Sequence, residues 1–497
     1  MKEIKKFYVT TSIAYVNAPP HIGYAMELLQ ADALARHHRL SGKDVFFLTG
    51  TDEHGKKVAE AAAKNDMEPR AYVDMISSRF DALCKALGIS EYHFIRTTDK
   101  SHISFVEGIW KHMKESGDIY KGEYEGRYCT GCEAFLREAE MDGEKCCLIH
   151  KKETQAVREE NYFFKFSKYA AQVEEAIRTD AIRILPEFRK KEILNLFSDE
   201  GVKDFSVSRP KESVGWGIPV PDDDSQIMYV WIDALMNYLS GIEYEENPMT
   251  KIWPADVHVI GKDIMRFHTM MLPAFLLSLG YPLSRCIAIH GFIFAEGQKM
   301  SKSLGNVIDP MGSIAQYGIE PVRYYLLREI PSDGDGDFSI ARFKERYAAD
   351  LQNGLGNLVS RVSVLGAGNF EAAKDITVSG ASVRARDIYK EYEGAIDAFQ
   401  LHRALEQVWV LVERSNKAVE DAKLWELAAR DAGEANKVFT ALAGNLAAIA
   451  YMLSPFLPET AEKIATAIGT DIAALSGDSD IPVRFQKPAT SLFPKLL

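Results

Sequence analysis

The sequence has little cysteine, no long apolar run and no excess of positive charge. Six cysteines in 497 residues are too few for the disulfide-stapled scaffold of a small secreted protein. No stretch of about 18 uncharged apolar residues occurs, which excludes a membrane-spanning helix. The formal net charge of −12 disfavours a protein that coats nucleic acid indiscriminately, but it is compatible with a local basic face.

The amino terminus does not have the pattern of a secretion signal. MKEIKKFYVTTSIAYV combines a basic start with an apolar run, but residues 10–12 (TTS) interrupt the run and no small-residue cleavage site follows. Four of the six cysteines crowd into residues 129–147, which is typical of metal binding in a reducing compartment. We therefore predict a cytoplasmic protein with no membrane partner.

Short runs rich in β-branched and aromatic residues alternate with helical patterns. The runs are residues 7–9, 45–49, 94–96, 257–261 and 286–291. Such alternation predicts an α/β fold, a Rossmann-like parallel sheet wound with helices. A helix is expected to start near His21, behind two prolines. Its amino end then points back to the carboxyl end of the first strand, the sheet edge where ligands bind.

The pattern changes along the chain, and the length suggests about two to four domains. Residues 1–116 are predicted to form the first half of the sheet domain, 117–207 an insertion, 208–342 the second half, and 343–497 an all-helical domain. The helical prediction depends on Ala-, Leu- and Glu-rich periodic segments that run to about residue 472.

The segment VNAPPHIGY, residues 16–24, is suited to binding a phosphate. A strand, a tight turn and a helix start bring backbone N–H groups and the positive end of the helix dipole together. Gly23 leaves room for a bound group against the backbone. The alternative is that Pro-Pro-His only begins a helix.

A second segment, GQKMSKSLGN at residues 297–306, carries Lys299 and Lys302 in a loop flanked by glycines. Such a loop can close over a triphosphate and neutralise the charge that grows on a departing pyrophosphate. A solvated surface loop is the alternative. Because the loop follows the strand predicted at 286–291, it starts at the same sheet edge as VNAPPHIGY. The two segments together are far more specific than either alone.

The clustered cysteines have the spacing of a metal site. Cys129-x2-Cys132 is followed, after a 14-residue spacer, by Cys147-x2-His150. Two such knuckles build a closed tetrahedral zinc site, so one structural Zn²⁺ per chain is expected to hold the insertion together. Cys146 competes with Cys147 as a ligand, and the alternative to a metal site is a set of ordinary thiols.

The two signatures resemble those of the class I aminoacyl-tRNA synthetases. HIGY is similar to the family's His-Ile-Gly-His signature and KMSKS matches its second signature, in the same order and at a wide separation. The text around them, with YVWIDALMNY at 229–238 and VIGKDIMRFH at 259–268, is similar to the methionyl members over most of residues 7–430. The resemblance implies a Rossmann-like catalytic domain, a zinc-knuckle insertion and an all-α anticodon-binding bundle.

The resemblance also implies the reaction, the substrates and the site residues. L-methionine is activated with ATP and Mg²⁺ to methionyl-adenylate and is then transferred to the 3′ end of tRNA(Met). The residues implied in catalysis are His21, Lys299 and Lys302. Those implied in ATP binding are Asn17, His21, Gly23, Tyr24, Gly261, Asp263 and Lys302. Those implied around methionine are Ile13, Tyr15, Asp52, Trp231, Leu235, Tyr238, Ile264 and His268, with Asp52 pairing with the ammonium group.

One residue departs from the first signature. Tyr24 stands where the family usually has a second histidine. A phenol can donate to a phosphate oxygen but carries no positive charge near neutral pH. Tyr24 therefore either contacts the phosphates without adding charge or does not take part.

The helical domain carries residues that resemble the family's anticodon-reading group. Asn353, Asn357 and Arg361 recur at i, i+4 and i+8, so a helix puts two amides and a guanidinium on one face. Such groups read the edges of unpaired bases, and Trp425 matches the family's stacking tryptophan. Without the resemblance, a polar helix face and a lone tryptophan are usually structural.

Two rival functions are open at this point. One is a class I synthetase for cysteine or leucine, and the other is a synthetase-like protein that binds tRNA or nucleotide without activity. The intact KMSKS argues against the second, and the insertion of about 90 residues leaves no room for a large editing domain of the leucine type. The chain ends at LFPKLL without an appended dimerisation domain, so a monomer is expected.

Overall fold

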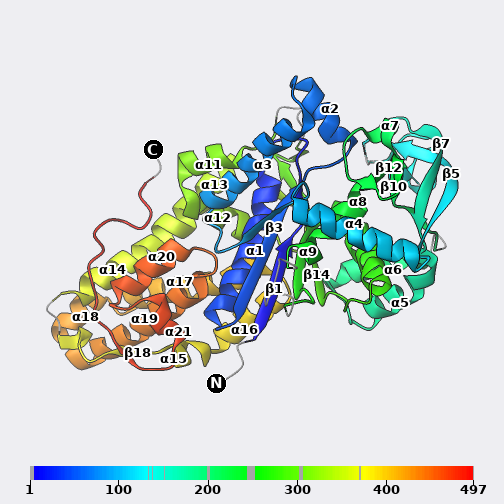
Figure 1. The fold of residues 1–497 in the computed structure, drawn as a ribbon. Coiled ribbons are helices and arrows are strands. Elements are labelled where there is room, and N and C mark those ends of the chain that lie inside the picture. The colour runs from blue at the N-terminus through cyan, green and yellow to red at the C-terminus, as the bar shows by residue number, and fades with distance from the viewer. Residues whose placement is uncertain are drawn as a thin grey trace.

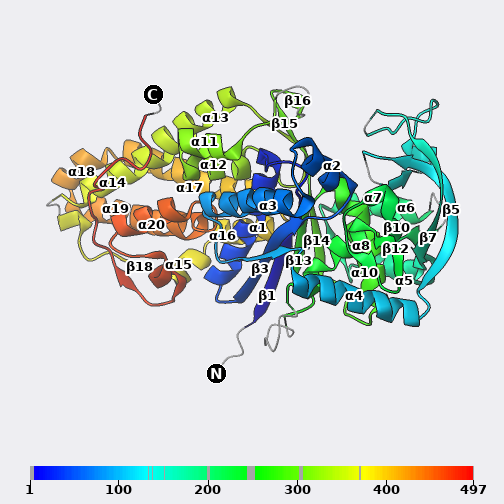
Figure 2. The same ribbon diagram turned by 45° about the horizontal axis from the view of Figure 1, so that its top comes forward.

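The computed structural model describes residues 5–131, 134–136, 138–149, 151–198, 202–242, 252–300, 306–368 and 371–495. Three regions lie side by side in Figures 1 and 2: the helical carboxyl-terminal region in yellow to red, the central sheet, and the insertion in cyan and green. Within the described ranges, no helix is long and apolar enough to cross a membrane.

The central sheet is parallel throughout, as predicted. Its strands follow the order β2 (Ala14–Tyr15), β3 (Asp44–Asp52), β1 (Lys6–Thr11), β13 (Val257–Gly261), β14 (Cys286–His290) and β8 (Arg183–Leu185), with β4 (His93–Arg96) also paired to β3. All five predicted strands are among them, so the prediction of a mixed α/β fold with a parallel sheet is confirmed.

Two strands of the sheet were not predicted. β2 and β8 are two and three residues long, too short to show a period in the sequence. β8 lies inside the segment predicted as an insertion, yet it pairs with β14 and forms an edge of the main sheet. The predicted boundary at 117–207 therefore does not separate the insertion from the sheet.

The two faces of the sheet are covered by different helices. Phe7 and Val9 of β1 pack into one hydrophobic core with α1 (Ile22–Leu40) and α3 (Pro69–Ala86), whereas Tyr8 packs into a second core with α4 (Lys100–Glu115). This alternation follows from the two-residue repeat of a strand. The predicted helix start is confirmed, because His21 is the N-cap residue of α1.

The insertion and the second half of the sheet region contain short antiparallel sheets and helices. One sheet joins β6 (Ala134–Leu136), β5 (Ile119–Cys129), β7 (Gln155–Phe164) and β9 (Phe205–Ser206), and another joins β10 (Ser208–Pro210), β12 (Asp223–Met228) and β11 (Pro219–Val220). The helices here include α5 (Phe166–Arg178), α6 (Glu187–Ser198), α7 (Lys211–Val214), α8 (Val230–Leu235), α9 (Asn237–Ser240) and α10 (Leu272–Ser278), and a π-helix spans Phe267–Met271. The helix α2 (Lys56–Lys64) follows β3 in the first half of the sheet region. β15 (Ile293–Ala295), β16 (Gln298–Lys299) and β17 (Gly336–Phe338) form a further small sheet.

The carboxyl-terminal region is helical, as predicted, apart from a short antiparallel pair of strands, β18 (Thr377–Val378) and β19 (Ile481–Pro482). Two helices that precede the predicted boundary at residue 343, α11 (Pro310–Tyr317) and α12 (Ile319–Arg328), lead into it. The region then contains α13 (Ile340–Arg346), a π-helix (Tyr347–Gly356), α14 (Asn357–Gly366), α15 (Gly380–Arg384), α16 (Asp387–Asp397), α17 (Leu401–Asp421), α18 (Leu424–Arg430), α19 (Ala432–Leu453), α20 (Pro458–Ala467) and α21 (Ile472–Ser476). Its apolar residues continue the core that covers the α1 face of the sheet. The helical region therefore packs directly on the sheet region (Figure 2).

Candidate active site at the carboxyl edge of the sheet

The predicted site residues gather where the parallel strands end. β1, β3, β13 and β14 end at Thr11, Asp52, Gly261 and His290. In a parallel sheet these ends lie at one edge, which is where ligands bind in such folds. The edge is also the place where α1 begins, so both predicted nucleotide signatures start there.

The backbone N–H groups at the start of α1 have partners within the chain. His21 is exposed, and its Nδ1 accepts a hydrogen bond from the Gly23 backbone N–H at 3.1 Å. A Cβ at position 23 would lie 3.0 Å from the His21 ring, so only glycine leaves the ring in this place. The Ile22 N–H donates to the Ile308 carbonyl at 3.2 Å, which joins the start of α1 to the chain that follows the lysine loop. Asn17 is half-buried just before this turn.

Tyr24 faces the interior instead of the solvent. Its hydroxyl lies 3.0 Å from Thr49 Oγ1 and 3.4 Å from the Gly50 carbonyl, and its ring packs edge-on against Phe80. Burial raises the pKa of this phenol well above its ordinary value. Tyr24 thus supports the signature from within the core, and a direct contact with phosphate stays a prediction.

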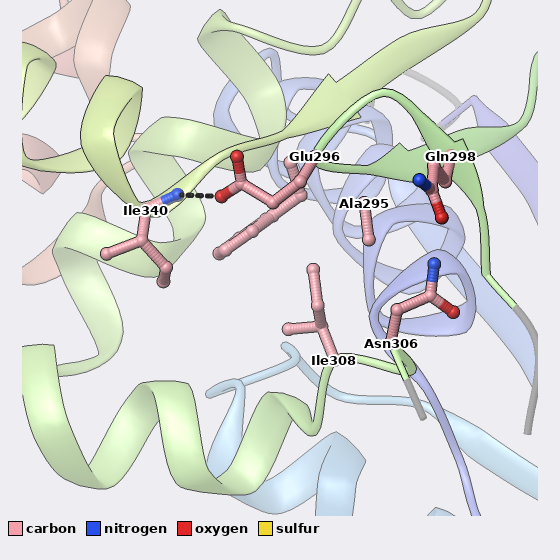
Figure 3. Close-up of a pocket in the computed structure, with 7 residues that line it drawn as sticks. Ala295, Glu296, Gln298, Asn306, Ile308 and Ile340 are labelled. Carbon is pink, nitrogen blue, oxygen red and sulfur yellow. Dashed lines mark hydrogen bonds between the residues drawn. The ribbon is translucent and has the colours of Figure 1, made fainter. Parts of the chain in front are cut away.

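The second signature is described only at its base. Lys299 belongs to strand β16, but its side chain is not described, and Lys302 lies outside the described residues. A cavity of about 300 Å³ lies beside the loop (Figure 3). Gln298, before the loop, and Asn306, after it, face each other there, and the Glu296 carboxylate accepts from the Ile340 N–H at 3.1 Å. None of the cavity's lining residues is among those predicted for ATP or methionine.

Asp52, which is predicted to bind the ammonium group, lies beside Tyr15, which is predicted to line the methionine site. β2 pairs with the end of β3 so that Tyr15 is in register with Asp52, whose side chain is buried. Gly55 has φ 110°, and a Cβ there would lie 2.5 Å from the Tyr15 hydroxyl. Glycine is therefore required both by the backbone and by the tyrosine. Ile13 is half-buried next to this pair.

The predicted thioether cage is built from three short helical elements. Trp231 and Leu235 lie on α8 and Tyr238 on α9. Trp231 stacks on Phe267 with ring centroids 3.7 Å apart and planes 7° apart. A turn at Met236 separates the two helices. Leu235 and Tyr238 are each 1% exposed, whereas Trp231 is half-buried.

His268 lies in the π-helix and contacts Tyr238. Its Nδ1 is 3.1 Å from the Ile264 carbonyl and its Nε2 is 2.7 Å from the Tyr238 hydroxyl. A carbonyl only accepts, so Nδ1 carries the hydrogen and Nε2 accepts from the tyrosine. Burial lowers the pKa of His268 to about 4, so the ring is neutral at pH 7. Ile264 itself is half-buried.

The sequence did not predict the pair of His290 and Glu27, which lies near Gly261, one of the residues predicted to bind adenosine. A Cβ at Gly261 would lie 2.8 Å from the exposed Asp263 carboxylate and 3.6 Å from the His290 ring. His290 Nε2 lies 2.9 Å from Glu27, which also accepts from the Ser12 N–H at 2.9 Å. Burial alone would lower the pKa of His290, but the bond and charge of Glu27 outweigh it and raise this pKa. The sequence offered one signal for this pair, because Glu27 is a charged residue among the apolar residues of α1.

A second missed group lies directly behind Asp52. Glu53 is fully buried and receives Arg96 Nε at 2.7 Å on one oxygen and Arg96 Nη2 at 2.9 Å on the other. Its backbone N–H donates to Thr97 Oγ1 at 2.9 Å and its carbonyl accepts from Trp216 Nε1 at 2.6 Å. Glu53 is therefore fixed at both its side chain and its backbone, next to the predicted ammonium ligand.

Two of the four predicted zinc ligands lie in the described part of the chain. Cys129 and Cys147 are 2% and 1% exposed, whereas Cys132 and His150 lie outside the described residues. No group of three metal-binding side chains occurs within the described ranges. The Cys147 carbonyl accepts from the Lys151 N–H at 2.8 Å, so the chain turns tightly at this cysteine as a knuckle requires. The buried thiols fit a closed zinc site.

The predicted anticodon residues lie on one continuous helical run and on α18. Asn353 lies within the π-helix, Asn357 begins α14, and both are exposed. Arg361 pairs with Glu420 at 3.2 Å. Trp425 is 46% exposed. The structure therefore leaves these two amides and this indole accessible to a ligand.

The fold and the site agree with one class of proteins. A family model described as tRNA synthetases class I (M) matches residues 7–156 and 141–363. With two nucleotide signatures at the edge of a parallel sheet, the chain belongs to the class I tRNA synthetases.

Individual relatives narrow this class. The chain is 40% identical to the methionine–tRNA ligase of Clostridium tetani over 94% of this chain and 74% of that protein. It is 41% identical to that of Thermotoga maritima over 92% of this chain and 74% of that protein. Within its class the chain belongs to the methionine–tRNA ligases.

Solved structures give the same result. Mycobacterium tuberculosis methionyl-tRNA synthetase bound by methionyl-adenylate has a TM-score of 0.88 and 37% identity, covering 99% of this chain and 100% of that chain. The apo form of that enzyme has a TM-score of 0.82 and 34% identity, covering 99% and 98%. The arrangement of the present chain is more similar to the adenylate complex.

Proposed function

We propose that the chain activates L-methionine with ATP and charges tRNA(Met), with the site residues in the roles given below. In the first step a methionine carboxylate oxygen attacks the α-phosphorus of ATP, and pyrophosphate leaves. In the second step the terminal ribose hydroxyl of the tRNA attacks the activated carbonyl, and AMP leaves. The observation that carries this proposal is the convergence of Asp52, the aromatic cage and the start of α1 at one sheet edge.

Catalysis in this proposal is positioning and charge stabilisation. Asp52 pairs with the ammonium group, and the cage of Trp231 and Tyr238 encloses the thioether, whose polarisable sulfur favours aromatic neighbours. His21 binds the phosphates, and the positive end of the α1 dipole attracts them. No side chain acts as a covalent nucleophile. Bound Mg²⁺ supplies positive charge to the phosphate oxygens.

Lysines and polar groups complete the assignment. Lys299 and Lys302 stabilise the departing pyrophosphate, because their positive charges oppose the charge that develops there. Gly261 and Asp263 hold the adenosine, with the Asp263 carboxylate accepting from ribose hydroxyls. Asn353, Asn357, Arg361 and Trp425 read the anticodon. We also propose that this reaction takes place in the cytoplasm.

Methionine-dependent exchange of pyrophosphate into ATP tests the function. Purified protein should exchange labelled pyrophosphate with methionine and not with leucine or cysteine. Exchange with leucine or cysteine alone would assign another amino acid, and no exchange with any of them would leave a binding protein. Lys302→Ala should lower kcat by roughly 10²–10³-fold with little change in methionine KM.

Metal analysis tests the zinc assignment. About one zinc ion per chain is expected, held by Cys129, Cys132, Cys147 and His150, because four protein ligands close a tetrahedral site. Cys147→Ser should lose the ion and lower the thermal stability of the insertion. Cys146→Ser is the matched control and should keep both. The reverse result would transfer the ligand role to Cys146.

A further inference from the structure

A buried chain of imidazole and carboxylate groups connects the two sides of the proposed methionine pocket. His54 Nδ1 lies 2.7 Å from Asp233 Oδ2, and His102 Nε2 lies 2.8 Å from Asp233 Oδ1. His102 Nδ1 lies 2.7 Å from Ser240 Oγ. We refer to the first three residues as the His54–Asp233–His102 bridge.

The hydrogen positions along the bridge follow from its chemistry. Asp233 is 1% exposed and, when ionised, only accepts, so both imidazoles donate to it. The Nε2–H of His102 is directed to Asp233, and its Nδ1 lies 2.7 Å from the Ser240 hydroxyl. A buried carboxylate is costly unless it is paired. Burial alone would raise the pKa of Asp233, but the charge of His54 and the bonds from both histidines outweigh it and lower this pKa.

The bridge joins the residues that would bind opposite ends of methionine. His54 follows Asp52 by two positions at the end of β3. Asp233 lies in the middle of α8, between Trp231 and Leu235. Residues four apart share a helix face, and a residue midway between them lies on the other side. Asp233 therefore anchors the back of α8 while Trp231 and Leu235 face the pocket.

The short helix α8 depends on such an anchor. It has six residues, too few to be stable by itself. His102 comes from α4 and Ser240 from α9, so the bridge ties α8 to a long helix as well as to β3. A loose apolar pocket distinguishes apolar side chains only weakly. A fixed distance between the ammonium site and the cage makes the pocket select amino acids by the length of their side chain as well.

We propose that the His54–Asp233–His102 bridge sets the length of the methionine pocket, and that its three members are positioning residues for the choice of amino acid. The inference depends on the proposed function, because it takes Asp52 as the ammonium site and Trp231 as part of the cage. None of the three residues contacts the reacting atoms in this account.

Paired substitutions test the proposal. Gln places an amide N–H near the position of a histidine Nε2–H, whereas Asn does not reach that far. His102→Gln should keep the methionine KM within about twofold of the wild type, and His102→Asn and His102→Leu should raise it about tenfold or more, as the loss of a bond to a buried carboxylate does. The KM for ATP should change less than twofold in all three. Selectivity for methionine over leucine and norleucine should fall with the rise in KM.

A matched control distinguishes a positioning role in the methionine pocket from a general contribution to the stability of the fold. His37 Nε2 lies 3.4 Å from Glu393, and its side chain is also nearly buried, but it joins α1 to α16. His37→Leu should lower the melting temperature without changing the methionine KM. If His102→Leu does not fold, the comparison of His102→Asn with His102→Gln decides the matter.

The outcomes are distinguishable. A wild type without methionine-dependent exchange would overturn the proposed function itself. An active wild type whose His102→Asn variant keeps its methionine KM and selectivity would overturn the bridge proposal alone. Equal rises in the KM for methionine and for ATP would also overturn it, because a general loosening of the fold predicts that result.

Discussion

His268 illustrates at the residue scale how burial controls a proton. The pKa of this ring is about 4 in the folded chain and takes the ordinary value of about 6.5 when unfolded. Between these values the unfolded chain binds more protons, so stability is lost as the pH falls through this window. From pH 7 to pH 5 the loss from this group should be about 2 kcal/mol. Urea unfolding at pH 7 and pH 5 should show that the free energy of unfolding falls more in the wild type than in His268→Gln. Equal falls would contradict the lowered pKa of His268.

Single residues were predictable where their type and spacing carry the chemistry. His21 could be placed at the sheet edge because it begins a recognisable helix, whereas Asp52 was implied only by the resemblance to the family. Glu27 and Glu53 could not, since their partners, His290 and Arg96, lie far away in the sequence. A buried carboxylate needs a partner, but only the fold shows which one it has.

At the scale of elements, the turn after β3 depends on Gly55. This residue has φ 110°, and a Cβ would meet the Tyr15 hydroxyl at 2.5 Å. Gly55→Ala should cost about 1–3 kcal/mol, because φ 110° with ψ 166° is a backbone conformation essentially confined to glycine, and it should also raise the methionine KM by displacing Tyr15. Gly42→Ala is the matched control, because Gly42 has φ 79° with nothing within 4 Å of its Cβ. Gly42→Ala should lower the stability without changing the methionine KM. A raised methionine KM in that control would contradict the argument that a Cβ at position 55 acts by displacing Tyr15.

Elements were predictable when they were long enough to repeat. The strands at 257–261 and 286–291 and the helix after His21 show their periods clearly, and the structure contains them. β8 has three residues, and its place in the sheet comes from pairing with β14. The break between α8 and α9 and the π-helix around His268 are likewise set by packing in the pocket, which sequence spacing does not encode.

At the scale of the whole molecule, one buried arginine joins the sheet region to the helical region. Arg323 on α12 is fully buried, and its Nη2 lies 2.7 Å from Asp32 of α1. Its Nε donates to the Phe456 carbonyl, between α19 and α20, at 2.7 Å, and its Nη1 donates to the Leu87 carbonyl at 3.0 Å. The helix that begins after His21 is thus hydrogen-bonded, through one side chain, to the helical carboxyl-terminal region.

Replacing Arg323 tests whether this junction contributes to tRNA charging as well as to stability. Arg323→Leu leaves Asp32 without one of its charged partners and should lower the free energy of unfolding by about 3–5 kcal/mol. Below its melting temperature the variant should lose more tRNA charging than methionine-dependent exchange, because only charging needs the two regions in one orientation. Arg342→Leu removes an exposed pair with Glu329 at 3.0 Å and should cost about 0–1 kcal/mol, with neither reaction changed. A parallel fall of charging and exchange in Arg323→Leu would show that the junction only stabilises the fold.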